Sequence, residues 1–122
     1  MPQVFVYGSL KRHQPNRPEF NRGLLTREGA VFLKDLVLKL PLQMFNMGYF
    51  PALVPAPLEE HTITGELYEI TDELLAVLDR IEGHPDHYRR VQYPAHLGEA
   101  WVYVRPELNA NYQYEIIPEG VW

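Results

Sequence analysis

Short apolar runs, rich in β-branched and aromatic side chains, alternate with glycine, proline, aspartate and asparagine along most of the chain. This pattern is typical of strands joined by turns. A two-residue alternation is clearest in residues 63–70. The runs that we expect to form strands are residues 4–7, 30–33, 36–40, 63–70, 91–93 and 100–104.

One segment has the spacing of an amphipathic helix. Thr71 can cap its start, and Gly83 suits its end. The apolar side chains between them recur at intervals of three and four residues, so we expect all of them, including the last, to face the core. These side chains are Leu74, Leu75, Leu78 and Ile81. A second, shorter helix is expected within residues 18–23.

Several strands and one main helix indicate an α+β fold, with a small mixed, barrel-like β-sheet and the helix packed against it. The chain has 122 residues and a mass of 14.2 kDa, which is enough for one domain with its own core. We therefore expect a single domain over residues 1–122. Residues 106–122 are expected to form an irregular tail, partly laid over the body by its aromatic side chains.

Composition excludes several classes of protein. The formal net charge of −5 gives no basic excess, which argues against a general nucleic-acid binder. Without cysteine, the chain has no disulfide, thiolate metal site or cysteine nucleophile. Charged residues interrupt the most apolar stretch, residues 31–47, so no membrane span is expected, and no signal peptide is visible at the start. These features predict a cytoplasmic protein; they leave the oligomeric state open.

Residues 4–12, VFVYGSLKR, are the first candidate for a functional site. An apolar strand ends at Gly8, where the absence of a side chain allows close approach of the backbone. The amides of Gly8, Ser9 and Leu10 could then turn toward a small anion. An ordinary strand-to-loop turn is the alternative. The nearby basic residues are either solvated surface or a means of steering an acidic substrate; they are Lys11, Arg12, Arg17 and Arg22.

Glu82, at the end of the main helix, is the second candidate. The negative end of the helix dipole favours its protonated form by about 0.3–1 kcal/mol, which is too little to make a catalytic base. Burial in an apolar cleft would have to raise the pKa further, toward about 6–7. The alternative is a surface glutamate at a fraying helix end.

Other side chains allow competing interpretations. His84, Asp86 and His87 could bind a metal, but they lie in a proline-containing loop and no distant third ligand is obvious. Tyr88 and Tyr103 could line a pocket or belong to the core.

Together, two motifs resemble the gamma-glutamyl cyclotransferase-like family, closest to its gamma-glutamylamine cyclotransferase branch. The first is VFVYGSLKR at residues 4–12 followed by Gln14, and the second is LDRIEGHP at residues 78–85, with Tyr88 and Arg90 after it. Weaker family elements match at residues 48–53 and 65–70. One departure is His13, where this branch usually carries glycine.

This resemblance implies a cofactor-independent enzyme without a metal. Tyr7, Gly8, Ser9 and Leu10 would hold the α-carboxylate of a gamma-glutamyl substrate, Tyr88 would line the pocket, and Glu82 would be the general acid and base. The substrate's α-amine would attack its own γ-carbonyl, which forms 5-oxoproline and releases an amine of unspecified identity. Two alternatives remain: a non-catalytic module that binds a small acidic ligand or a protein partner, and a metal-dependent hydrolase centred on the two histidines.

Overall fold

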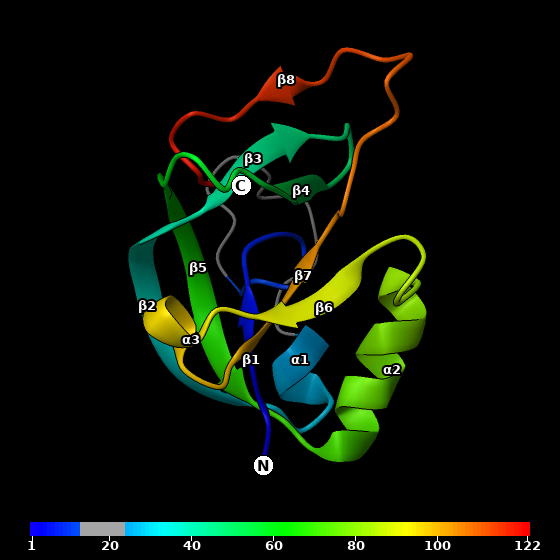
Figure 1. The fold of residues 1–122 in the computed structure, drawn as a ribbon. Helices are drawn as coiled ribbons and strands as arrows, with labels where there is room; N and C mark the ends of the chain where they lie inside the picture. Colours follow the sequence, from blue (N-terminus) through cyan, green and yellow to red (C-terminus); the bar gives the residue numbers. More distant parts are fainter. Residues whose placement is uncertain (13–23) are drawn as a thin grey trace.

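A computed structural model of the chain describes residues 1–12 and 24–122. Strands dominate, and the longest helix stands beside them (Figure 1). In chain order the elements are β1 (Gln3–Val6), α1 (Leu24–Arg27), β2 (Val31–Leu40), β3 (Leu42–Asn46), β4 (Pro51–Pro55), β5 (His61–Glu69), α2 (Asp72–Glu82), β6 (Arg89–Gln92), α3 (Pro94–Leu97), β7 (Trp101–Val104) and β8 (Glu115–Ile116).

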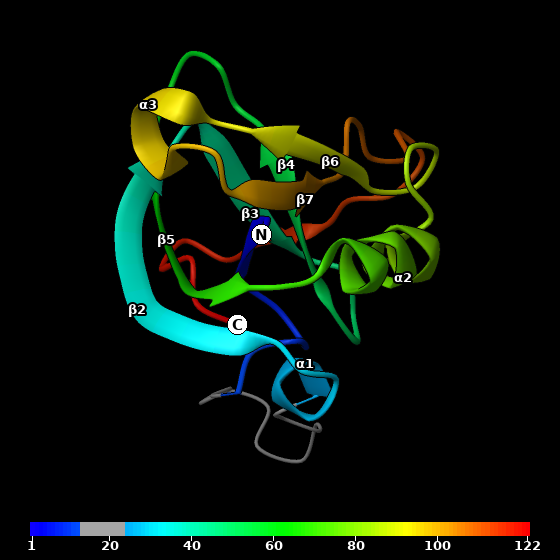
Figure 2. The same cartoon turned by 90° about the horizontal axis from the view of Figure 1, so that it is seen from below.

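These strands form two sheets. The larger has the order β2-β5-β1-β7-β6, and the smaller has the order β4-β3-β8. Strands β1 and β7 run parallel, whereas the other pairs are antiparallel. Only Pro41 separates β2 from β3, so one long run of chain passes from the first sheet into the second. Figure 2 shows β2 as an arc around one side of the molecule.

The central strands β1 and β7 are buried on both faces. In β1, Val4 and Val6 face one core cluster, and Phe5 faces the other. The first cluster includes the buried leucines of α2, and the second includes residues of β3 and β4. Helix α2 and the smaller sheet therefore pack against opposite faces of the larger sheet. The ends of β1 and β7 therefore lie between helix α2 and the smaller sheet.

Helix α2 begins and ends where the sequence predicts. The Thr71 hydroxyl accepts the N–H of Leu74 at 3.0 Å, and Gly83 adopts the left-handed conformation (φ 68°) that glycine tolerates at a helix end. The expectation for Ile81 is wrong, because its side chain is 61% exposed. The leucines of the earlier turns reach the sheet, whereas the last turn borders a cavity.

The expected α+β fold is confirmed, with differences of detail. The runs at residues 30–33 and 36–40 are one strand, β2, with a bulge between Phe32 and Lys34. Strands β3 and β4 and helix α3 were not expected, and the two sheets do not close into a barrel.

The tail is less irregular than expected, because β8 pairs with β3. Trp122 is buried, in agreement with a tail laid over the body. The helix expected at residues 18–23 lies outside the described residues. In the described part of the chain, none of the helices combines the length and apolarity that crossing a membrane requires.

Candidate functional site

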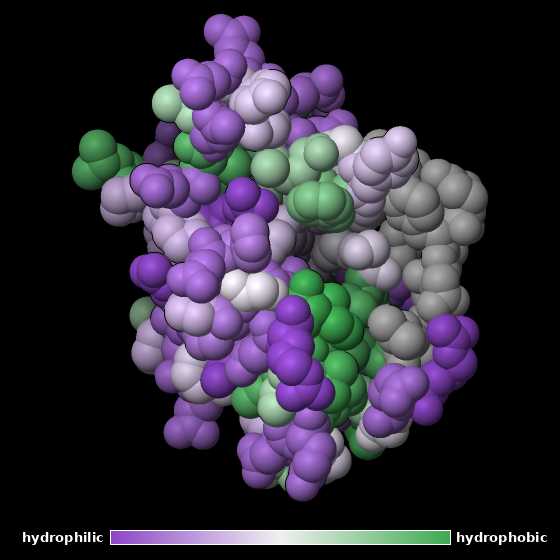
Figure 3. Space-filling view, turned by 90° about the vertical axis from the view of Figure 1, so that its right-hand side faces the viewer, coloured by the Kyte–Doolittle hydropathy of each residue, from purple (hydrophilic) through white to green (hydrophobic). Residues whose placement is uncertain are grey.

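A cavity of about 520 Å³ opens where the turn after β1, the start of β4, the end of α2 and the end of β7 meet. Figure 3 looks onto the face that carries α2 and shows a hollow bordered by hydrophobic side chains. The lining residues are Phe5, Val6, Tyr7, Gly8, Ser9, Leu10, Phe50, Pro51, Arg80, Ile81, Glu82, Gly83, His87, Tyr88, Tyr103 and Arg105.

All six residues that the sequence singled out for the site line this one cavity: Tyr7, Gly8, Ser9, Leu10, Glu82 and Tyr88. The two motifs are far apart in the sequence. The fold brings them together because β1 is a central strand of the larger sheet and α2 packs against that sheet.

The turn after β1 has the features of an anion-binding backbone. The N–H of Lys11 donates to the carbonyl of Gly8 at 3.0 Å, which closes the turn. No described residue accepts a hydrogen bond from the N–H of Gly8 or of Leu10. A Cβ at Gly8 would lie 2.9 Å from two carbons of the Pro51 ring, so only glycine allows this approach. Two backbone donors are thus available beside the cavity.

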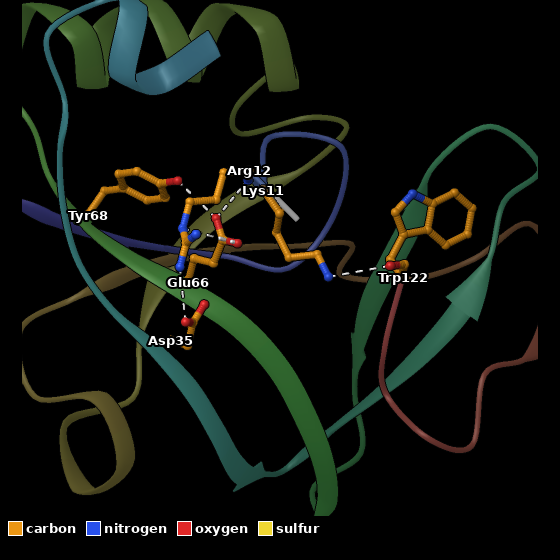
Figure 4. A network of polar contacts seen from close by, with 6 residues as sticks. All are labelled: Lys11, Arg12, Asp35, Glu66, Tyr68 and Trp122. Atoms are coloured by element: carbon orange, nitrogen blue, oxygen red, sulfur yellow. Dashed lines mark hydrogen bonds and ion pairs between the residues drawn. The ribbon is translucent and has the colours of Figure 1, made fainter. Parts of the chain in front are cut away.

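A buried carboxylate anchors the far end of this turn (Figure 4). Glu66 is 2% exposed and accepts the backbone N–H of Arg12 at 2.7 Å and the hydroxyl of Tyr68 at 2.8 Å. The Arg12 guanidinium lies 3.9 Å from Glu66 and 3.0 Å from Asp35. Charge-assisted hydrogen bonds of this kind are stronger than neutral ones, so the network holds the turn against β5 and β2.

Of the four basic residues near the turn, the structure describes Lys11 and Arg12, and Lys11 is buried and not part of a solvated surface. Lys11 is 2% exposed, and its Nζ donates to the carbonyl of Trp122 at 3.4 Å (Figure 4). Burial lowers the pKa of Lys11, although Glu66 opposes that change. Arg12 interacts with Glu66 through its backbone N–H and its guanidinium. The other two members of the predicted cluster, Arg17 and Arg22, lie outside the described residues.

Glu82 is the last residue of α2, and its side chain faces the cavity without a protein partner. Within residues 1–12 and 24–122, no hydrogen bond or ion pair engages its carboxyl group. Burial raises the pKa of Glu82 to about 7. At neutral pH the group is therefore divided between its acid and base forms, which suits proton transfer in either direction.

The pocket tyrosines use their hydroxyl groups to bind the backbone. The Tyr7 hydroxyl donates to the carbonyl of Tyr103 at 2.6 Å, and the Tyr88 hydroxyl donates to the carbonyl of Pro51 at 3.0 Å. Burial raises the pKa of both phenols, and the nearby charge of Glu82 adds to this effect. They are neutral at physiological pH, and they shape and rigidify the cavity wall.

A second network fastens the end of α2 to the sheet. Asp79, one turn before Glu82, accepts two hydrogen bonds from the guanidinium of Arg90 at 3.0 and 3.2 Å. Tyr103 donates a third at 2.7 Å. Although burial opposes ionisation, the hydrogen bonds from Arg90 and Tyr103 hold the pKa of Asp79 below its ordinary value.

The histidine-rich loop offers little for a metal. Nδ1 of His84 accepts the backbone N–H of Arg90 at 3.1 Å, which occupies one ring nitrogen. Among the residues whose placement is described, no group of three histidine or acidic side chains could hold a metal ion.

Sequence reasoning missed part of the lining. Phe50 lies directly before β4, and Pro51 is the first residue of that strand. Both belong to a segment that resembled the family only weakly. Arg80 and Arg105 carry the cationic groups of the wall, and Arg105 follows directly after β7, where an irregular tail was expected to begin.

The comparisons with known proteins agree on the family. The family model described as "Gamma-glutamyl cyclotransferase, AIG2-like" matches residues 4–122. The gamma-glutamylaminecyclotransferase of Rattus norvegicus is 37% identical over 93 residues, which are 74% of this chain and 60% of the rat protein. The chain thus spans less than two thirds of that relative's length.

Solved structures support the same assignment. Protein ytfP of Escherichia coli has a TM-score of 0.68 at 30% identity, covering 98% of this chain and 95% of that one. An aig2-like protein of Mus musculus has a TM-score of 0.59 at 29% identity, covering 93% and 80%. The chain belongs to the AIG2-like gamma-glutamyl cyclotransferase family.

Proposed function

We propose that this protein is a cofactor-independent gamma-glutamyl cyclotransferase that acts on gamma-glutamyl amines and releases 5-oxoproline. One observation carries the proposal: Glu82, whose pKa burial raises to about 7, lines the same cavity as the backbone donors of Gly8 and Leu10. Membership of the family and the name of the rat relative support the same activity.

In this reaction Glu82 moves one proton. Its carboxylate takes a proton from the substrate's α-ammonium group, because only the neutral amine can attack. The amine nitrogen then forms a bond to the γ-carbonyl carbon, which closes the five-membered ring. The bond from that carbon to the leaving nitrogen breaks as Glu82 returns this proton to the leaving nitrogen. The attacking nitrogen loses a second proton when it becomes the ring amide, and that proton ends on the released amine, which leaves as an ammonium ion. The products are 5-oxoproline and a free amine, and no water is consumed.

The N-terminal turn fixes the substrate for this attack. The amides of residues 8–10, with the hydroxyl of Ser9, bind the α-carboxylate of the glutamyl group. Tyr7 and Tyr88 contribute their rings to the wall, since their hydroxyls are bonded to backbone carbonyls. Because the nucleophile and the electrophile belong to one molecule, holding the reactive rotamer can supply up to about 7–11 kcal/mol of the barrier reduction.

The direct test is turnover of gamma-glutamyl-ε-lysine, followed by mass spectrometry of 5-oxoproline and lysine. Wild-type protein should form both in equal amounts, and Glu82→Gln should reduce kcat by a factor of about 10²–10⁴. Glu73→Gln, an exposed glutamate at the other end of α2, is the matched control and should retain full activity. Equal turnover by wild type and Glu82→Gln would refute the assigned role.

A non-catalytic module that binds small acids is the competing proposal, since amides and arginines in the wall favour an anion. It would be preferred if gamma-glutamyl compounds raised the melting temperature of the wild-type protein without any turnover. A buried carboxyl group beside the ligand argues against it, because its negative charge would weaken anion binding.

A further inference from the structure

The charge of the cavity wall is opposite in sign to that of the whole chain. The chain carries 16 acidic and 11 basic residues and has a net charge of −5. Among the described residues, the cavity is nevertheless lined by two arginines, Arg80 and Arg105, against a single carboxyl group, Glu82. Such a wall favours a substrate that presents carboxylates to it.

Arg105 is held in this wall by its backbone. Its N–H donates to the carbonyl of Leu53 at 2.8 Å, which ties the end of β7 to β4. Its guanidinium lies 5.4 Å from the centre of the Tyr88 ring, and the residue is half-buried. The backbone of Arg105 is therefore anchored to β4, and its guanidinium packs against the ring of Tyr88.

Within the described residues, Arg105 and Arg80 of the wall form no ion pair, unlike two other arginines near the site. Arg12 and Arg90 each form ion pairs with carboxylates. In the part of the chain that the structure describes, no carboxylate lies within ion-pairing distance of Arg105. A guanidinium fixed in a cavity wall without a counter-ion is well suited to bind a carboxylate of a ligand through two parallel hydrogen bonds.

Glu82 and Arg105 influence the same two pocket tyrosines with opposite sign. The charge of Glu82 raises the pKa of Tyr7 and Tyr88, after the larger effect of burial, and the charge of Arg105 lowers it. The pKa of Glu82 itself responds to burial, with no contribution from Arg105. Glu82 and Arg105 thus both lie near these tyrosines and line one cavity without forming an ion pair with each other.

We propose that Arg105 binds a carboxylate carried by the leaving amine, and so selects gamma-glutamyl conjugates of amino acids over conjugates of simple amines. This inference rests on the proposed function, in which the amides of residues 8–10 hold the α-carboxylate of the glutamyl group. A volume of about 520 Å³ is within the range of pockets that hold a whole small ligand, so it leaves room for a second half of the substrate. An amino-acid leaving group supplies a second carboxylate, whereas a simple amine has none.

Two substrates that differ in one carboxylate test the assignment: gamma-glutamyl-ε-lysine and gamma-glutamylcadaverine. Wild-type protein should have a kcat/KM about 10- to 100-fold higher for the lysine conjugate. Arg105→Gln should remove this preference through a rise in KM for the lysine conjugate, and should change kcat/KM for the cadaverine conjugate by less than about twofold. Arg105→Lys should restore part of the preference, because it keeps the charge but loses the planar fork.

Arg89→Gln is the matched control, because Arg89 is exposed on β6 and does not line the cavity. It should leave both substrates unaffected. Equal losses for both substrates in Arg105→Gln, or a wild-type enzyme without preference, would overturn the assignment. Calorimetric binding of the two conjugates to Glu82→Gln and to Glu82→Gln with Arg105→Gln separates this question from catalysis. If the wild type turned over neither conjugate, the proposed function would fail, whereas the affinity ratio would still decide the role of Arg105.

Discussion

The hydroxyl of Tyr103 donates a 2.7 Å hydrogen bond to Asp79, and this contact joins β7 to the last full turn of α2. Arg90 of β6 binds the same carboxylate through two further hydrogen bonds. Since Glu82 lies three residues after Asp79, the three bonds fix the end of the helix from which Glu82 projects. Asp79 is thus a positioning residue for the proposed acid and base.

Replacing Asp79 by Asn should loosen this end of the helix. The amide keeps the shape of the side chain but cannot accept all three hydrogen bonds as a carboxylate does. We expect the free energy of unfolding to fall by about 1–3 kcal/mol, measured in urea. We also expect kcat to fall about tenfold while KM changes little, because the turn proposed to bind the α-carboxylate is untouched.

Tyr103→Phe removes a single hydrogen bond of the same network and should have a smaller effect on both quantities, with a loss of about 1 kcal/mol. A variant at Asp79 that lost stability but kept the wild-type kcat would show that the contact serves the fold and does not position Glu82.

Gly8→Ala tests whether the turn must approach β4 as closely as it does. The new Cβ would lie 2.9 Å from two carbons of Pro51, and a proline ring cannot move aside as a flexible side chain would. We expect the turn to separate from β4, with a loss of stability of about 1–3 kcal/mol and an increase of KM in the cyclotransferase assay.

Ser9→Ala is the comparison for this variant, because it alters the side chain of the turn and leaves its backbone in place. If backbone amides supply most of the binding, its KM should rise by less than about threefold, which corresponds to less than the ~1 kcal/mol of a typical hydrogen bond. A larger increase of KM in Ser9→Ala than in Gly8→Ala would show that the Ser9 hydroxyl, and not the backbone of the turn, supplies most of the binding.

The hydrogen bond from Arg12 to Glu66 leads to a similar prediction for the other end of the turn. Glu66→Gln keeps the size of the buried side chain but removes the charge that faces the Arg12 amide and guanidinium. We expect a loss of about 1–3 kcal/mol in stability and a higher KM. Asp35→Asn is the matched control: it removes the exposed partner of the same guanidinium, so it should cost less than about 1 kcal/mol.

The sequence predicted those features that depend on neighbouring residues. The limits of α2 follow from a capping threonine and a terminal glycine, both within one turn of the helix. The strands at residues 4–7, 63–70 and 100–104 follow from local apolar runs, and β1, β5 and β7 lie there. The resemblance to the family predicted that the turn at Gly8 and Glu82 belong to one site, and these residues line one cavity.

Features that depend on distant contacts were not predictable in this way. Lys34 and Asp35 looked like a break between two strands, yet they lie within β2, an edge strand whose polar side chains can face solvent. Ile81 matched the helical period, but its side chain is exposed at the border of the cavity. Arg105 gave no local signal, since its importance depends on the position of Tyr88.

The stability of the folded protein should depend on pH through Glu82. Burial raises its pKa from 4.5 to about 7, so the folded state binds the proton more tightly than the unfolded chain does. Below pH 4.5 the carboxyl group is protonated in both states and carries no penalty. As pH rises to about 7, stability is lost, and above that value the folded state bears the full cost of a buried charge. The difference in pKa sets this cost at about 3 kcal/mol at most.

Glu82→Gln removes the titrating group, so the variant should become more stable than the wild type as pH rises. The measurement is the free energy of unfolding in urea at each pH. We expect the advantage of Glu82→Gln over the wild type to be larger at pH ~8 than at pH ~4.5 by about 1–3 kcal/mol. Glu73→Gln, at an exposed position at the other end of α2, is the control variant measured beside it. The same titration predicts that kcat/KM falls about tenfold for each unit of pH below ~7, since the proposed base is then protonated. Parallel pH curves for wild type and Glu82→Gln would show that Glu82 titrates at the ordinary pKa of a solvated carboxyl group.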